Sequence, residues 1–427
     1  MFKALSSKLP ALVLLLTGVF ALSGFGCRQN TAVDQSTGEL VVWGLWQESA
    51  DMEPVLKAFA EQYGTKVTYK KIASVATYER DLLSALAEGR GPDVFVIHHN
   101  WVNDKQRLMT PAPANIIDER AVRDEFVDVA AADLVRGGQV YALPSSVDTL
   151  AMYYNKDLLN AAGIARPPRT WTDFQQMIER VTKVNRLGTI QQSAAALGTA
   201  GNINRASDIF QLLMMQSGLS IFDAQNNKVS INNDIGARAL TFYTDFANKS
   251  KKVYTWNLQQ DYSIDAFAAG KTAVMFNYSY SVPTIKAKNP RLNFGVAEIP
   301  QIAGSSDSNR VNFASYWPFA VSNSSRSPNM AWNFVRFLTS KNPSDSINRA
   351  ALTPPARRDS VVELQRDASI GVFAEQAITA QSWPRFDSAA VDTILNAAID
   401  NVVTGAATSE DALRQAEEQI NNLTPAQ

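Results

Sequence analysis

The sequence predicts an α/β fold, because short apolar segments alternate with amphipathic helical segments along the chain. Residues 39–44 (ELVVWG) and 93–97 (DVFVI) have the apolar character of buried strands, and 66–70 (KVTYK) alternates like a strand. Between them, helical periodicity runs over 52–63 and 78–87. This alternation of strands and helices is typical of a parallel sheet covered by helices on both faces.

The same alternation continues to the end of the chain, without internal repeats. We expect strands at 150–154, 272–276 and 292–299, and helices at 157–162, 206–218, 234–249, 330–338, 388–403 and 409–423. A further helix is expected to begin at Trp171, with Thr170 as its N-cap. Gly64 and Gly163 follow helical segments and are C-cap candidates.

The N-terminus has the layout of a secretory signal. Lys3 and Lys8 are basic, residues 9–22 are apolar, and small residues precede Cys27. The apolar run is shorter than the ~20 residues of a membrane span. We therefore expect residues 1–26 to be a signal peptide.

Cys27 is the only cysteine of the sequence, so it has no partner for an internal disulfide. Its position after the expected cleavage point resembles that of bacterial lipoproteins, although Gly24 and Phe25 depart from the usual Leu and small residue there. We expect Cys27 to carry the lipid, followed by a flexible polar tether over 27–38. The alternative is a plain signal peptide with an incidental cysteine.

Composition argues against several classes of function. The formal net charge is −1, so no basic excess exists to bind nucleic acid. The only histidines, His98 and His99, would point to opposite faces of a strand, which disfavours a shared metal, and we expect neither a metal nor a cofactor. No phosphate loop or serine-hydrolase elbow is present, so we do not expect an enzyme.

Aromatic and amide side chains at strand ends favour a polyhydroxylated ligand. Tryptophans 43, 171 and 332 lie in periodic segments and are expected to pack in cores, whereas four others lie outside such segments: Trp46, Trp101, Trp317 and Trp383. Aromatic faces can cover the apolar faces of sugar rings, while amides and carboxylates bind hydroxyls. For each single tryptophan, local packing remains an equal alternative.

Five segments, in a characteristic order and spacing, carry a family resemblance. They are EGRGPDVFV (88–96), YALPSSVDTLAMYYNKDLL (141–159), PRTWTDF (168–174), AFAAGKTAVMFN (266–277) and AWNFVRFLTS (331–340). With them the chain resembles the extracellular solute-binding proteins of ABC importers, in the sugar-binding cluster that includes maltose-binding protein.

The resemblance implies a two-lobed periplasmic-binding-protein fold with discontinuous lobes. Lobe 1 would take 39–148 plus 296–353, and lobe 2 would take 149–295 plus 354–427. Hinge strands would cross near 146–150 and near Gly295, and the ligand would lie in the cleft between the lobes.

Position by position, the resemblance and the strand ends imply a set of ligand-binding residues: Trp46, Gln47, Glu48, His99, Asn100, Trp101, Asp148, Asn204, Asn277, Tyr280, Trp317 and Trp383. At the positions of Asn100 and Trp101 the maltose-binding relative has an acid and a base. The ligand of that relative therefore cannot be assumed for this chain.

The expected function is a monomeric, lipid-anchored, extracytoplasmic receptor that delivers a sugar or oligosaccharide to the permease of an ABC importer. A non-sugar solute, such as a polyamine, glycerol phosphate or organic anion, is the alternative. An anion would need arginines in the cleft, and Arg357 and Arg385 are the candidates. An exported glycosidase and a purely structural surface protein remain further alternatives.

Overall fold

The computed structural model describes residues 38–306 and 309–423. The expected signal peptide, Cys27 and nearly all of the tether lie outside these residues. Within the described ranges, no helix combines the length and apolarity needed to cross a membrane.

The first lobe is built on a five-stranded sheet with the order β2-β1-β3-β16-β6. β1 pairs in parallel with β2 and β3, and β16 pairs antiparallel with β3 and β6. The strands are β1 (Leu40–Gly44), β2 (Val67–Lys71), β3 (Val94–Val96), β6 (Ala142–Leu143) and β16 (Phe319–Val321). Because β16 comes from a much later part of the sequence, this lobe is discontinuous.

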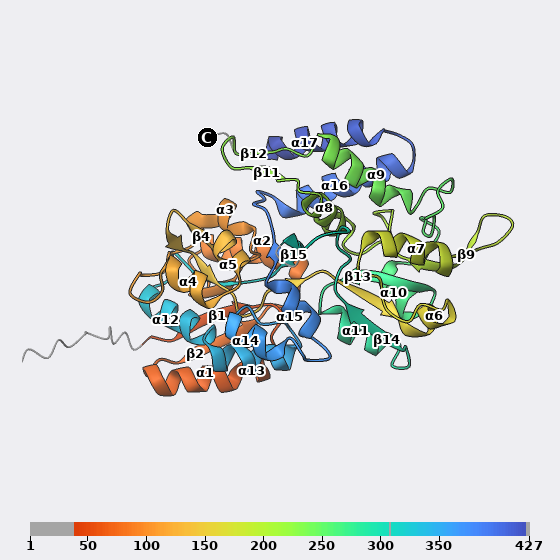
Figure 1. Ribbon diagram of the computed structural model, residues 1–427. Helices are drawn as coiled ribbons and strands as arrows, with labels where there is room; N and C mark the ends of the chain where they lie inside the picture. Colours follow the sequence, from red (N-terminus) through yellow and green to blue (C-terminus); the bar gives the residue numbers. More distant parts are fainter. Residues whose placement is uncertain (1–37, 307–308, 424–427) are drawn as a thin grey trace, which may run out of the picture. The chain divides into compact units, whose positions relative to one another are not determined.

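Helices from both ends of the sequence cover this sheet. In Figure 1, α1 and α12 lie beside the sheet, and residues of both belong to one apolar core. The elements around the sheet are α1 (Ser49–Tyr63), α2 (Val75–Ala87), α3 (Trp101–Lys105), η1 (Gln106–Leu108), α4 (Glu119–Glu125), α5 (Asp128–Leu134), β4 (Val135–Arg136), β5 (Gln139–Val140), α12 (Pro328–Leu338), α13 (Lys341–Ala351) and α14 (Arg358–Leu364).

The second lobe is built on a sheet with the order β14-β8-β13-β10-β9. β13 pairs in parallel with β10 and antiparallel with β8. The strands are β8 (Ala151–Asn155), β9 (Lys183–Val184), β10 (Ile190–Ala195), β13 (Thr272–Asn277) and β14 (Phe294–Ala297).

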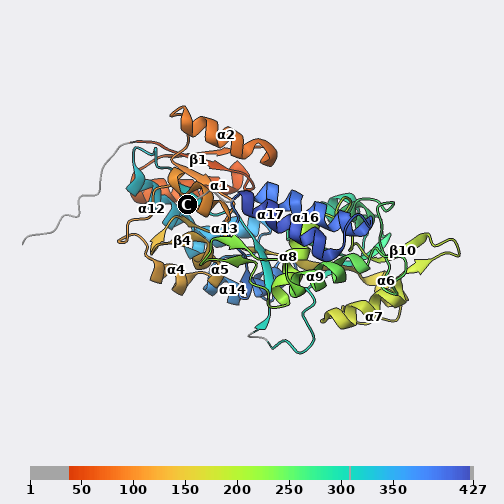
Figure 2. The same ribbon diagram turned by 90° about the horizontal axis from the view of Figure 1, so that it is seen from above.

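A second apolar core lies around this sheet. Figure 2 shows the C-terminal helices α16 and α17 beside α8 and α9, which they contact. The remaining elements of this lobe are α6 (Lys156–Ala161), α7 (Trp171–Val181), α8 (Ala206–Gln216), β11 (Phe222–Asp223), β12 (Lys228–Val229), α9 (Asp234–Asp245), α10 (Ser263–Ala268), α11 (Ser281–Lys288), α16 (Ser388–Val403) and α17 (Ser409–Leu423).

A small sheet of order β17-β15-β7 joins the segments that run between the two larger sheets. It consists of β7 (Asp148–Thr149), β15 (Asn312–Ser315) and β17 (Ala380–Gln381), and α15 (Gly371–Ala377) contacts β7. β7 lies within the first expected hinge. Gly295 pairs inside β14, and the chain returns to the first sheet through β15. The exact lobe boundaries stay a prediction.

Local signals in the sequence predict several element ends correctly. The Thr170 side chain accepts a hydrogen bond from the backbone N–H of Asp173, and α7 begins at Trp171. Gly64 and Gly163 have φ values of 70° and 68°, in the left-handed region that glycine tolerates.

Helix α9 ends at Asp245, four residues before the end that the sequence predicts. The carbonyl of the next residue, Phe246, accepts the backbone N–H groups of Thr255 and Trp256. These long-range bonds turn the chain away from the helix axis, which periodicity alone does not reveal.

Candidate ligand-binding site

Trp317, in the loop before β16, is the centre of an aromatic cluster. Its ring centroid lies 6.1 Å from Trp46, 6.1 Å from Tyr78, 5.2 Å from His98 and 5.4 Å from Trp101, each in an edge-to-face arrangement. The Trp46 side chain remains 48% exposed, whereas Trp101 is 7% exposed. Trp46 is therefore open to solvent, whereas Trp101 is packed against its neighbours.

His98 and His99 do not point to opposite faces, so that sequence prediction is wrong. Their ring centroids are 4.5 Å apart. Both residues follow the end of β3 at Val96, where the alternation of a strand no longer applies. Among the residues that the structure describes, no group of three or more histidines, cysteines or carboxylates could hold a metal ion.

His99 is buried and held by Asp133 of α5. Its Nδ1 lies 2.8 Å from Asp133 Oδ2, and its ring stacks on Tyr316 at 4.6 Å. Tyr316 and Ser382 also donate to the Asp133 carboxylate. Burial acts to raise the pKa of Asp133, but the charge of His99 and these hydrogen bonds outweigh it and hold the pKa below its ordinary value.

Asn100 connects the end of β3 with the segment that precedes α16. With its amide oxygen facing Arg385, Asn100 accepts from Nε and Nη2 at 2.8 Å each, and its Nδ2 donates to the Trp383 carbonyl at 3.2 Å. Trp383 itself is buried, and its indole N–H donates to Gln211 Oε1 at 2.7 Å. Asn100 and Trp383 thus form part of a contact between the lobes.

Asp148, on β7, binds the turn between β13 and α11. Its carboxylate accepts the backbone N–H of Ser279 at 3.0 Å and the Ser279 hydroxyl at 2.7 Å. Burial raises the pKa of Asp148 to about 7, against the opposing effect of the Ser279 hydrogen bonds. The acidic side chain predicted near the hinge therefore anchors the loop that carries Tyr280.

Tyr280 and Asn204 lie together at the carboxyl end of β13. Tyr280 is 40% exposed, and its hydroxyl lies 3.0 Å from Asn204 Oδ1, which also accepts from Asn277 Nδ2 at 3.0 Å. Arg205 Nε donates to the Tyr280 hydroxyl at 3.0 Å. Arg205 has φ 68°, a strained value for a residue with a Cβ and one often found at functional sites.

The two polar residues after Trp46 have different surroundings. Gln47 is buried, and its side-chain Oε1 has no hydrogen-bond partner in the described part of the chain. The Glu48 carboxylate forms an ion pair with Lys71 and is 65% exposed. Gln47 thus has a buried acceptor without a protein partner in the described residues, while Glu48 is exposed beside Lys71.

A large cavity of about 1140 Å³ lies away from most of these residues. Trp383 is the only predicted site residue that lines it, alongside the end of α8 and residues such as Arg136. The aromatic and amide groups described above are the better candidate site, because they follow strands of both larger sheets and include two exposed aromatic residues, Trp46 and Tyr280.

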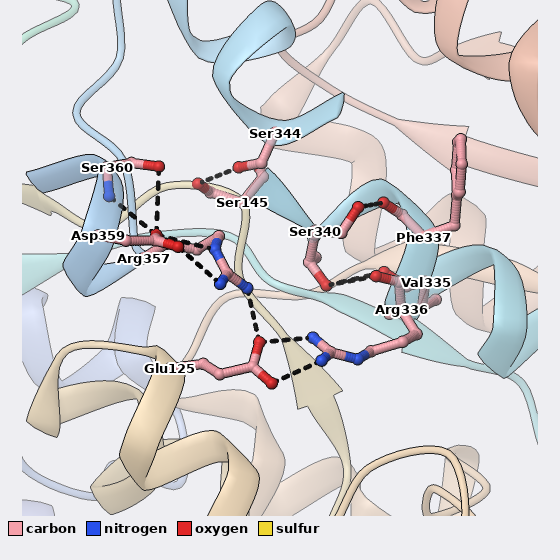
Figure 3. A network of polar contacts seen from close by, with 11 residues as sticks. Glu125, Ser145, Val335, Arg336, Phe337, Ser340, Ser344, Arg357, Asp359 and Ser360 are labelled. Atoms are coloured by element: carbon pink, nitrogen blue, oxygen red, sulfur yellow. Dashed lines mark hydrogen bonds and ion pairs between the residues drawn. The ribbon is translucent and has the colours of Figure 1, made fainter. Parts of the chain in front are cut away.

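The two arginines considered for an anion site have different roles. Arg385 lies at the candidate site beside Asn100. Arg357 instead binds Glu125 and Asp359 in a separate network with Arg336 (Figure 3). Arg357 is therefore not a ligand candidate.

Sequence reasoning did not assign roles in the site to Arg205, Ser279 or Asp392. Arg205 immediately follows Asn204, which the resemblance marked, so its position is a usable signal. Asp392 contacts Arg385 from within α16, and no local pattern distinguishes it from a solvated helix residue.

A model of the family described as bacterial extracellular solute-binding protein matches residues 45–342. The chain belongs to this family. The match includes the whole of the second sheet, all strands of the first sheet except β1, and every candidate site residue except Trp383. Membership in a family of solute-binding proteins also supports a binding role over an enzymatic one.

Similar proteins include several sugar-binding members. A maltotriose-binding protein of Pyrococcus abyssi is 24% identical over 71% of this chain and 63% of its own length, so the match spans less than two thirds of that relative. A galactooligosaccharide-binding protein of Bacillus subtilis is 23% identical over 95% of both chains.

Solved structures show the same fold. A cyclo/maltodextrin-binding protein complexed with maltotetraose has a TM-score of 0.76 at 21% identity, covering 90% of this chain and 96% of its own. A cyclic α-maltosyl-1,6-maltose binding protein from Arthrobacter globiformis has a TM-score of 0.73 at 19% identity, covering 90% and 98%.

Proposed function

We propose that this protein captures a neutral sugar or oligosaccharide between its lobes and delivers it to the permease of an ABC importer. The observation that carries the proposal is the exposed Trp46 beside Trp317, together with the exposed Tyr280 and the amide of Asn204 next to it. Such rings can cover the apolar face of a pyranose, and the amides can bind its hydroxyls. The names of the sugar-binding relatives point to the same ligand class.

Within this proposal the twelve residues predicted from the sequence divide by accessibility. The exposed Trp46 and Tyr280 would contact sugar faces, with Trp317 beside Trp46, and the partly buried Asn204 would bind hydroxyls. The other residues, which are more buried, would hold these groups in place, and they are Gln47, His99, Asn100, Trp101, Asp148, Asn277 and Trp383. The exposed Glu48 would contact only a long ligand.

Isothermal titration against a panel of neutral mono- and oligosaccharides tests the ligand class. We expect saturable heat with at least one sugar and none with spermidine, citrate or glycerol phosphate. Binding of one of these charged solutes, with no heat from any sugar, would contradict the carbohydrate proposal and favour the alternative solute class.

We also propose that Cys27 is acylated and that residues 27–38 tether the folded part to the outer face of the cell membrane. We further propose that the protein acts as a monomer. A short tether would keep the receptor at high effective concentration beside its permease. Cys27→Ser should move the protein from the membrane fraction to the soluble fraction while leaving sugar affinity unchanged. Retention of the variant in the membrane fraction would contradict the anchor.

A further inference from the structure

Two arginines and two aspartates form a cluster at the second-lobe side of the candidate site. Arg385 Nη1 lies 2.9 Å from Asp392 Oδ1, and Arg205 Nη1 lies 3.9 Å from Asp208 Oδ2. Each guanidinium is therefore matched by one carboxylate.

Further hydrogen bonds hold the carboxylates in position. The Ser207 hydroxyl donates to Asp392 Oδ1 at 3.0 Å, and the Tyr278 hydroxyl donates to Asp208 Oδ2 at 2.9 Å. Burial, together with the charge of Asp392, raises the pKa of Asp208, and the two arginines act against this rise. The two ion pairs thus influence each other and form one electrostatic unit.

The two arginines of the cluster form hydrogen bonds with two residues of the candidate site. Arg385 donates to the Asn100 amide oxygen, and Arg205 donates to the Tyr280 hydroxyl. The Arg385 side chain is only 4% exposed, so its charge lies where water screens it weakly. Without Asp392, this guanidinium would be an attractive partner for a carboxylate or phosphate.

We propose that these internal ion pairs make the site selective for uncharged solutes, with Asp392 excluding anions by compensating Arg385. The inference rests on the proposed function, because it concerns the same site, but it specifies the charge of the solute. Arg205 and Arg385 then act as hydrogen-bond donors that orient Tyr280 and Asn100, and the charge of the buried Arg385 is compensated by Asp392.

Asp392→Asn tests the inference, because asparagine keeps an oxygen for Arg385 and Ser207 and removes only the charge. The probes are the best-binding neutral sugar of the panel, its uronic-acid counterpart and inorganic phosphate, each measured by titration calorimetry. We expect the wild type to bind both anions only weakly, and the variant to bind them roughly tenfold more tightly while its affinity for the neutral sugar changes by less than about threefold.

Asp359→Asn is the matched control. It makes the same change in net charge, and Asp359 pairs with Arg357 in the separate network of Figure 3. We expect this variant to bind the anions no better than the wild type. Equal anion binding by the two variants would overturn the inference.

The inference and the carbohydrate proposal can fail separately. Gain of phosphate binding by Asp392→Asn, with no sugar binding to the wild type, would refute only the carbohydrate proposal. Sugar binding without a gain of anion binding would refute only the inference. If circular dichroism shows that Asp392→Asn is unfolded, Asp208→Asn applies the same test through Arg205.

Discussion

At the scale of single residues, exposure separates tryptophans that pack in a core from Trp46, which is accessible to a ligand. Trp43, Trp171 and Trp332 are buried, as their periodic surroundings predict. Trp46 is nearly half exposed although it follows Trp43 by only three residues, because β1 ends at Gly44 and the chain leaves the sheet there. The end of a strand thus changes the exposure of the side chain.

Trp46→Ala should lower sugar affinity by about tenfold, equivalent to ~1.4 kcal/mol, because a ring face that covers the sugar is lost. The free energy of unfolding of this variant should change by less than about 0.5 kcal/mol.

Trp332→Ala should instead lower the free energy of unfolding by about 3–5 kcal/mol by leaving a cavity in the core. Calorimetry and urea unfolding measure the two effects. Unchanged sugar affinity in Trp46→Ala would contradict its assignment.

Asp148 should make stability depend on pH. Its pKa is raised to about 7 in the folded protein from an ordinary value of 3.8, so between these pH values the folded state binds more protons than the unfolded state. This carboxyl therefore lowers stability as pH rises from about 4 to 7, and its effect is constant above that range.

Asp148→Asn removes this titration. The stability of the variant relative to the wild type should increase by roughly 4 kcal/mol between pH 4 and pH 7 and then level off. Urea unfolding at a series of pH values measures the difference. A pH-independent difference would show that Asp148 does not titrate in this range.

At the scale of elements, ion pairs join helices that are distant in sequence. Glu125, the last residue of α4, accepts from Arg336 of α12 and from Arg357 just before α14 (Figure 3). The Arg357 side chain is 12% exposed, so the loss of its partner would leave a poorly hydrated charge. This bridge fixes the segment that leads out of α13 against the first lobe.

Glu125→Ala should lower the free energy of unfolding by about 2 kcal/mol, because two charge-assisted contacts are lost together. Glu119→Ala is the control from the same helix. Glu119 pairs with Arg123 on the surface, and its loss should cost less than about 1 kcal/mol. Equal values for the two variants in urea unfolding would mean that the bridge is no stronger than a surface pair.

At the scale of the whole molecule, contacts to both lobes allow a ligand to stabilise a closed arrangement. The exposed Trp46 follows a strand of the first sheet, and the exposed Tyr280 follows a strand of the second. A solute that contacts both would favour the state in which they approach each other.

Addition of a bound sugar at 100 times its dissociation constant should stabilise the folded state by about 2.7 kcal/mol. Small-angle scattering should show a smaller radius of gyration at the same concentration if the lobes close. An unchanged radius, together with the expected stabilisation, would indicate that the sugar binds without closure. A sugar that showed no binding in the titration panel serves as the control.

The sequence by itself determined the features that depend on neighbours along the chain. Periodicity and turn residues predicted the α/β class, the α7 N-cap and the glycine ends of two helices, because these depend on backbone interactions within a few residues. The family resemblance further identified the two-lobed solute-binding fold.

Only the tertiary structure decided which side chains meet. The proximity of His98 and His99, the link from Asn100 to Arg385 and the pairing of Arg385 with Asp392 all arise where strands have ended and separate segments pack together. Such contacts depend on the folding of the whole chain, and a local sequence pattern does not predict them. For this reason the sequence predicted a set of aromatic and amide groups for the ligand site, which stays a prediction, but not the ion pairs proposed to set its charge selectivity.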